Sequence, residues 1–173
     1  MGRNKGASKD IIKKLAKHYV DVQKGIGTHK SPKDYGAFPF EPYSHTPGMA
    51  GVQQPGMTGQ VKEDIISRFF ELGVIVQNGQ ISLHPLVLKK AEFIDPKKSN
   101  SSEYDAPYLV FTFCKTTFVY LIDNKKGIEI LTNYGKSLYV DGYTLGLNET
   151  HAIINREDKI NRVVIHLNQT MVQ

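Results

Sequence analysis

The hydrophobic residues of the N-terminal third recur at helical spacing. Residues 8–24 carry apolar side chains three or four positions apart, at Ile11, Leu15, Tyr19 and Val22. This spacing places them on one face of a helix. Ser8 is a suitable N-cap, and the glycine at Gly25 can end the helix. The sequence therefore predicts an amphipathic helix here.

A second helix is predicted over residues 60–72. Its apolar face consists of Val61, Ile65, Phe69 and Leu72. Thr58 is a candidate N-cap and Gly73 a candidate for the residue that follows the last turn. Glu63 would then lie in the first turn, where the positive end of the helix dipole favours an ionised carboxylate.

After Gly73 the pattern changes to alternation of apolar and polar residues. VIVQ and QISLH flank Asn78-Gly79, which is a strong signal for a β-hairpin. Further short runs are YLVFTFC, TTFVYLID, GIEILTN, KSLYVDGYTLG, HAIIN and INRVVIHLN. Regular short strands separated by turns predict an antiparallel sandwich. Leu109, Phe111 and Phe113 share one parity, so we expect them on one buried face.

The predicted fold class is therefore α+β and mainly β. It is an antiparallel β-sandwich preceded by two helices and a long ordered loop. Residues 1–73 are predicted to form a helical and aromatic-loop segment, and residues 74–173 the sandwich domain. We expect the polar stretch DPKKSNSSEYDAP to be a loop.

The segment 35–63 reads YGAFPFEPYSHTPGMAGVQQPGMTGQVKE and has neither helical nor strand periodicity. Glycine and proline are usual in loops, but this loop also carries aromatic rings and amides. Rings stack on flat apolar faces and amides bind hydroxyls, so the segment is a candidate binding surface. Its aromatic content favours order over disorder.

The candidate substrate-binding residues of this segment are Tyr43, His45, Gln53, Gln54, Gln60 and Glu63. Their amides, rings and carboxylate suit sugar hydroxyls. Glu63 and His45 are also the candidates for a catalytic role, as a base or a proton relay. The alternative is structural: the polar side chains satisfy backbone groups of the loop, and Glu63 complements the helix dipole at the surface.

Charge and residue spacing argue against a nucleic-acid partner and against a metal site. The net charge is +5, but the lysines are spread along the chain, so we expect no nucleic-acid partner. The histidines lack metal-ligand spacing, and we predict no metal site and no cofactor. The single cysteine, Cys114, lies in an apolar run and is expected to be a buried, inert thiol.

No apolar stretch is long enough to span a membrane. No signal peptide is visible, so a cytoplasmic location is expected, with secretion as part of a larger protein left open.

The stretch YGAFPFEPYSHTPGMAGVQQPGMTGQVKEDI, followed by RFFELGV, resembles the C-terminal end of large, mostly bacterial, uncharacterised proteins. These are similar to (α/α)-toroid glycoside hydrolases and disaccharide phosphorylases with a β-sandwich tail. The resemblance covers most of residues 10–94 and, more loosely, the tail to Asn168. It implies that this chain is the C-terminal part of such a protein, without the remaining helices of the toroid.

Two main hypotheses follow. The chain is either a carbohydrate-associated part of a hydrolase- or phosphorylase-like protein, or a non-catalytic β-sandwich module for sugar binding or subunit assembly. A third is a small enzyme that uses His45 and Glu63. We expect the isolated chain not to be catalytic. A saccharide is the expected ligand, and a second copy or a missing helical domain the expected protein partner.

Overall fold

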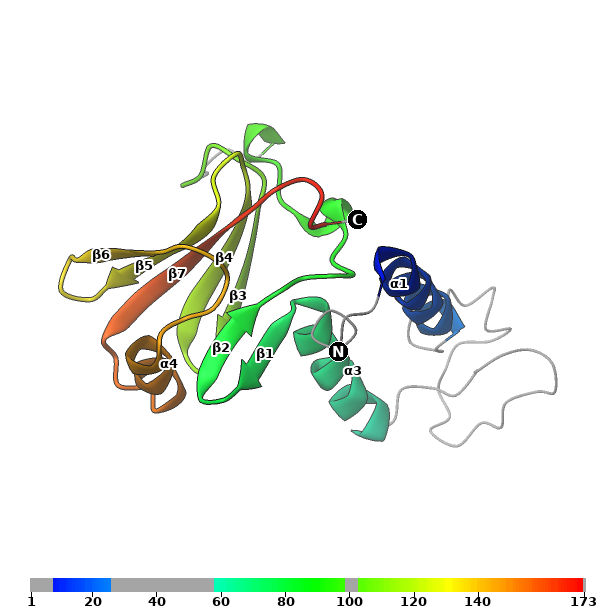
Figure 1. The fold of residues 1–173 in the computed structure, drawn as a ribbon, viewed down its shortest axis with the longest axis horizontal. Coiled ribbons are helices and arrows are strands. Elements are labelled where there is room, and N and C mark those ends of the chain that lie inside the picture. The colour runs from blue at the N-terminus through cyan, green and yellow to red at the C-terminus, as the bar shows by residue number, and fades with distance from the viewer. Residues whose placement is uncertain (1–7, 26–57, 99–102, 173) are drawn as a thin grey trace. The chain divides into compact units, whose positions relative to one another are not determined.

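The computed structural model describes residues 8–25, 58–98 and 103–172, except for the side chains of residues 22–25 and 58–64. The chain divides into two units, with the division between Arg68 and Phe69. Figure 1 draws the described helices and strands in colour. The long loop predicted between the two helices lies outside the described residues.

Helix α1 (Lys9–Gly25) confirms the first predicted helix. The hydroxyl oxygen of Ser8 accepts a hydrogen bond from the backbone N–H of Ile11 at 3.3 Å. This contact satisfies one of the N–H groups that have no partner within the helix. Ser8 is therefore the N-cap that the sequence predicted.

Helix α3 (Thr58–Glu71) confirms the second predicted helix but begins earlier than expected. Thr58 is its first residue rather than its cap, and the first turn contains no acidic residue. The prediction that Glu63 lies in the first turn is therefore wrong. The dipole effect fades within one turn, so the argument made from it for Glu63 does not apply.

The end of α3 is fixed by Gly73. This glycine has a φ of 70°, and its N–H donates to the carbonyl of Phe70 at 2.9 Å. The chain then enters the hairpin of β1 (Val74–Gln77) and β2 (Gln80–Leu83). Asn78 and Gly79 both have positive φ, as the predicted two-residue turn requires.

The remaining strands form a five-stranded sheet in the order β3-β4-β7-β5-β6, and they follow one another across the sheet in Figure 1. Their bounds are β3 Tyr108–Phe113, β4 Thr116–Ile122, β5 Gly127–Thr132, β6 Ser137–Val140 and β7 Ile160–Leu167. The α+β class with a strand-rich region is thus confirmed. One pairing differs from the antiparallel prediction, because β4 and β7 are parallel.

The parallel pair arises from a helix that the sequence pattern did not reveal. The run HAIIN was expected to be a strand, but it belongs to α4 (Leu147–Ile154). A short apolar run such as Ala152-Ile153-Ile154 fits a buried helix as well as a strand. The helix carries the chain from β6 back to β7, which enters the sheet between β4 and β5. Such a helical crossover is what allows two strands of one sheet to be parallel.

One hydrophobic core joins the two sheets. Its fully buried residues come from one face of the large sheet and from the hairpin, and include Phe118, Tyr120, Ile128, Ile130, Ile165, Ile81 and Leu83. Leu109 belongs to this core, and Phe111 and Phe113 pack against it. The burial predicted for this face of β3 is confirmed for Leu109, whereas Phe111 and Phe113 are half-buried.

The opposite face of the large sheet, here called the outer face, carries a smaller apolar cluster. Val119, Leu121 and Val164 are buried there, with Tyr104 and Tyr108 packed against them. β7 is therefore buried on both faces, as expected for the central strand of a sheet. β6 lies at one edge, and its residues 137–139 are exposed.

Cys114 is not in a strand. With Lys115 it forms the two-residue turn between β3 and β4, and the two residues have φ of 49° and 70°. The thiol is half-buried rather than fully buried. The apolar run that contains Cys114 thus covers the end of β3 and the turn after it. The alternation of apolar and polar residues does not show where the strand ends.

Candidate functional site

The structure leaves most of the predicted site residues undescribed. Tyr43, His45, Gln53 and Gln54 lie outside the described residues. Gln60 and Glu63 belong to α3, but their side chains also lie outside the described part. The candidate site described below comes instead from the large sheet.

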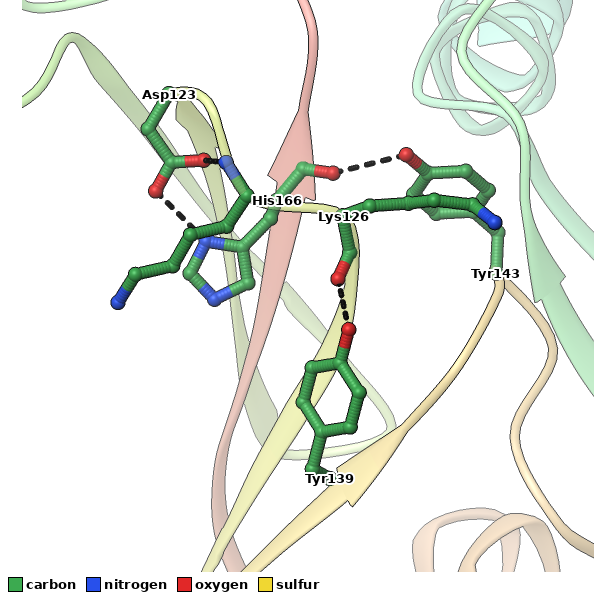
Figure 2. Close-up of polar contacts among 6 residues, drawn as sticks. Asp123, Lys126, Tyr139, Tyr143 and His166 are labelled. Atoms are coloured by element: carbon green, nitrogen blue, oxygen red, sulfur yellow. Dashed lines mark hydrogen bonds and ion pairs between the residues drawn. The ribbon is translucent and has the colours of Figure 1, made fainter.

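A polar corner lies at the carboxyl ends of β4 and β7. Because these strands are parallel, their ends meet at the same edge of the sheet. Asp123 follows β4, and its N–H donates to the carbonyl of Leu167 at 3.1 Å. Its Oδ2 lies 2.8 Å from Nδ1 of His166, and its Oδ1 accepts the N–H of Lys125 at 2.9 Å. Figure 2 shows Asp123 joining the loop before β5 to His166.

The contact with Asp123 fixes the orientation of the His166 ring. A carboxylate oxygen accepts hydrogen bonds, so Nδ1 of the imidazole is the donor in this contact. The His166 side chain is only 5% exposed. Nε2 points away from Asp123 in Figure 2. The pair therefore holds an almost completely buried ring in one orientation.

Tyr143 fixes the same corner from the other side. Its hydroxyl donates to the carbonyl oxygen of His166 at 3.0 Å. Burial raises the pKa of Tyr143, so the hydroxyl stays protonated and remains a donor. The carbonyl of Tyr143 accepts the N–H of Leu83 at 2.8 Å. Tyr143 thus ties β7 to the small hairpin.

Tyr139 adds an exposed aromatic ring to the corner. Its hydroxyl donates to the carbonyl oxygen of Lys126, as Figure 2 shows. A Cβ atom added at Gly127 would lie 2.7 Å from the hydroxyl oxygen of Tyr139 and 3.0 Å from its Cζ. The ring therefore lies close over Gly127, where any larger residue would collide with it. Tyr139 is nevertheless 64% exposed. Its Cβ is attached to β6 and its hydroxyl is bonded to Lys126, so the ring is fixed in position while much of its surface faces solvent.

Glu129 and Ser137 border this ring. Glu129 lies directly opposite Tyr139 across the β5–β6 pair, and both side chains belong to the outer face. The hydroxyl of Ser137 donates to Oε1 of Glu129 at 2.8 Å. We call Tyr139, Gly127, Glu129 and Ser137 together the Tyr139 platform.

The platform is suited to binding. The ring offers an apolar surface for stacking, and the carboxylate of Glu129 accepts hydrogen bonds. The hydroxyl groups of Tyr139 and Tyr143 are both engaged with backbone carbonyls. Within the described residues, no group of three or more His, Cys, Asp or Glu side chains could hold a metal ion.

Sequence reasoning did not single out this site. The alternation in KSLYV places Tyr139 opposite in parity to Leu138 and Val140, and that signal could have assigned it to the outer face. The contact of Tyr139 with Gly127 depends on the strand register, which the sequence does not reveal. The pairing of Asp123 with His166 joins residues 43 positions apart and depends on the parallel pair that was not expected.

Comparisons with known proteins do not assign the chain to a family. No protein-family model matches the chain. A search among curated proteins likewise finds no significant match. In the described part of the chain, no helix is both long and apolar enough to cross a membrane.

Proposed function

We propose that this chain is a carbohydrate-associated protein, the C-terminal part of a glycoside hydrolase- or phosphorylase-like protein, and that it contributes saccharide binding. The observation that supports this most directly is the Tyr139 ring, which is held by Lys126 and Gly127 and is still 64% exposed. Aromatic rings and hydroxyl-binding groups side by side suit the apolar faces and polar edges of sugars.

The fixed position of the ring favours a binding role over a purely structural one. A side chain that becomes immobilised on binding costs about 0.5–1.5 kcal/mol in lost rotamer freedom. Tyr139 has already lost that freedom through its hydrogen bond to Lys126. A ligand that stacks on it therefore avoids most of this cost.

The proposal retains the predicted loop residues. Tyr43, His45, Gln53, Gln54, Gln60 and Glu63 are proposed as further sugar contacts, and catalysis by the isolated chain is not expected. A cytoplasmic location is also proposed. It agrees with the single cysteine, which leaves no intrachain disulfide for an oxidising compartment to maintain.

A saccharide screen of the whole chain tests the proposal. The chain is applied to a glycan array, and its thermal unfolding is recorded with neutral and charged oligosaccharides. We expect at least one class of oligosaccharide to bind on the array and to raise the unfolding temperature in a concentration-dependent manner. If no saccharide at millimolar concentration does either, the carbohydrate function is wrong.

Subunit assembly is a second candidate function, favoured by the apolar surface of α3. Ile65 and Ile66 are 54% and 70% exposed. The end of the helix is fixed, because Leu72 lies in the core and its carbonyl accepts the hydroxyl of buried Tyr120. Sedimentation of the wild type and of Ile66→Lys tests this function. Loss of self-association in the variant would support it, and a wild-type monomer at all concentrations would exclude homo-oligomerisation.

A further inference from the structure

We propose that the Tyr139 platform binds one ring of a neutral hexopyranose chain, with Tyr139 as the stacking surface and Glu129 as the acceptor for the ring's hydroxyl groups. This inference rests on the proposed carbohydrate function and names the ligand class and the residues that select it.

The first step of the argument is the shape of the site. The hydroxyl end of the Tyr139 ring lies close to Gly127, because a Cβ atom added there would be 2.7 Å from the hydroxyl oxygen and 3.0 Å from Cζ. A ligand would stack on the surface of the ring that faces away from Gly127. Residues of the neighbouring strand lie beside the ring rather than above it, since Glu129 is its direct partner across the β5–β6 pair. Such a surface accepts a flat ring and leaves its ends open for further units of a chain.

The second step is the hydrogen-bonding chemistry at the rim. The carboxylate of Glu129 can only accept, and Oε1 already receives the hydroxyl of Ser137 at 2.8 Å. None of the described residues donates a hydrogen bond to Oε2. The edge of a ligand beside Glu129 must therefore present donors. A hexopyranose with equatorial hydroxyls has an apolar C–H face for Tyr139 and donors along its edge for Glu129.

The third step is charge. A sugar with its own carboxylate or sulfate beside Glu129 would place two negative charges close together, which is unfavourable. Lys126, in the loop before β5, is paired with Asp141 at 3.4 Å. The rim beside the ring therefore favours a neutral sugar.

Hydrogen bonds to the backbone hold the Tyr139 platform in place. Tyr139 is oriented by the carbonyl of Lys126, and the loop that carries this carbonyl is held by Asp123. Asp123 in turn is bonded to buried His166 at 2.8 Å. The stacking ring is therefore connected to the centre of the sheet through a short series of hydrogen bonds.

The experiment measures the affinity of the full chain for a neutral β-1,4-linked glucose hexasaccharide by NMR titration. A uronic-acid oligosaccharide of equal length is the charged comparison. Tyr139→Ala should weaken binding of the neutral chain at least tenfold. Tyr134→Ala is the matched control, because Tyr134 is 76% exposed in the β5–β6 turn, and should change the affinity less than twofold.

Two further variants separate binding from folding. Tyr139→Phe retains the ring but not the hydroxyl that fixes it, and should weaken binding two- to fivefold. Glu129→Gln retains an acceptor for Ser137 and should reduce the preference for the neutral over the charged oligosaccharide at least threefold. Unchanged unfolding temperatures of these two variants show that the fold is intact.

The outcomes distinguish the two proposals. If a saccharide binds the wild type and Tyr139→Ala binds it equally well, the platform is not the site, while the carbohydrate function stands. If Tyr139→Ala leaves the affinity unchanged and converts a dimer to a monomer, the platform is a self-association surface and the inference is wrong. If no saccharide binds the wild type, both proposals are wrong.

Discussion

Replacing Gly73 by alanine should destabilise the protein far more than the same replacement at Gly135. Both glycines have nearly the same positive φ, 70° and 74°. Their surroundings differ, however. An added Cβ at Gly73 would lie 2.2 Å from the backbone carbon of His84 and 2.3 Å from the nitrogen of Pro85, whereas at Gly135 nothing lies within 4 Å. The pair therefore separates the conformational cost of alanine from the cost of collision.

The magnitudes follow from these surroundings. An L-residue in the left-handed region costs about 1–2 kcal/mol, so Gly135→Ala should lose about that much. At Gly73 the backbone of residues 84 and 85 must also move by roughly 1 Å, which resembles overpacking and adds about 1–3 kcal/mol. The 2.9 Å hydrogen bond from the N–H of His84 to the carbonyl of Gly73 would be lost or distorted, for about another 1–2 kcal/mol. We expect a total of about 3–7 kcal/mol.

Urea unfolding of the wild type and the two variants, followed by circular dichroism, measures the difference. The slopes of the transitions should be equal, so that the midpoints report the free energy of unfolding. If the two variants lose the same free energy to within about 0.5 kcal/mol, the close approach of the α3–β1 junction to residues 84 and 85 is wrong.

Three further predictions concern the sheet and its turns. Phe111→Ala removes a ring that stacks on Phe118 with centroids 5.3 Å apart and should cost about 3–5 kcal/mol in urea unfolding; a loss under about 1 kcal/mol would show that this face of β3 is not buried. Lys115→Gly should stabilise the protein by about 0.5–1 kcal/mol, because Lys115 is exposed at φ 70°, and a destabilised variant would contradict the turn geometry. Lys159 bonds Glu157 and lowers the pKa of its carboxyl, so this pair stabilises the fold above the unfolded pKa of about 4.3 and ceases to do so as the pH falls through the lower folded pKa. Glu157→Gln should accordingly show a smaller loss of unfolding temperature than the wild type between about pH 5 and pH 3, and identical pH profiles would rule out the contribution.

The local elements were predictable because their signals are local. Ser8 caps α1 through its own side chain, and Asn78-Gly79 supplies the positive φ angles of the hairpin turn without help from distant residues. The alternation of Leu109, Phe111 and Phe113 identified the buried face of β3 because side chains alternate along any strand. These inferences required no knowledge of strand order.

The features that could not be predicted depend on contacts distant in sequence. The segment HAIIN became a helix in a context where the hydroxyl of Thr150 accepts the N–H of Ile81, 69 positions away. That helix makes β7 parallel to β4, and the parallel pair brings Asp123 to His166. The candidate site therefore follows from one helical crossover that a short apolar run does not specify.

The most direct test of the central claim is a titration of the full chain with the neutral glucose hexasaccharide, monitored at the backbone amides of β5 and β6. The account predicts chemical-shift changes that saturate with ligand and centre on residues 126–129 and 137–141. It predicts that Tyr139→Ala needs at least tenfold more ligand for the same changes, while Tyr134→Ala does not. Saturable changes confined to other parts of the chain, or an unchanged affinity of Tyr139→Ala, would contradict it.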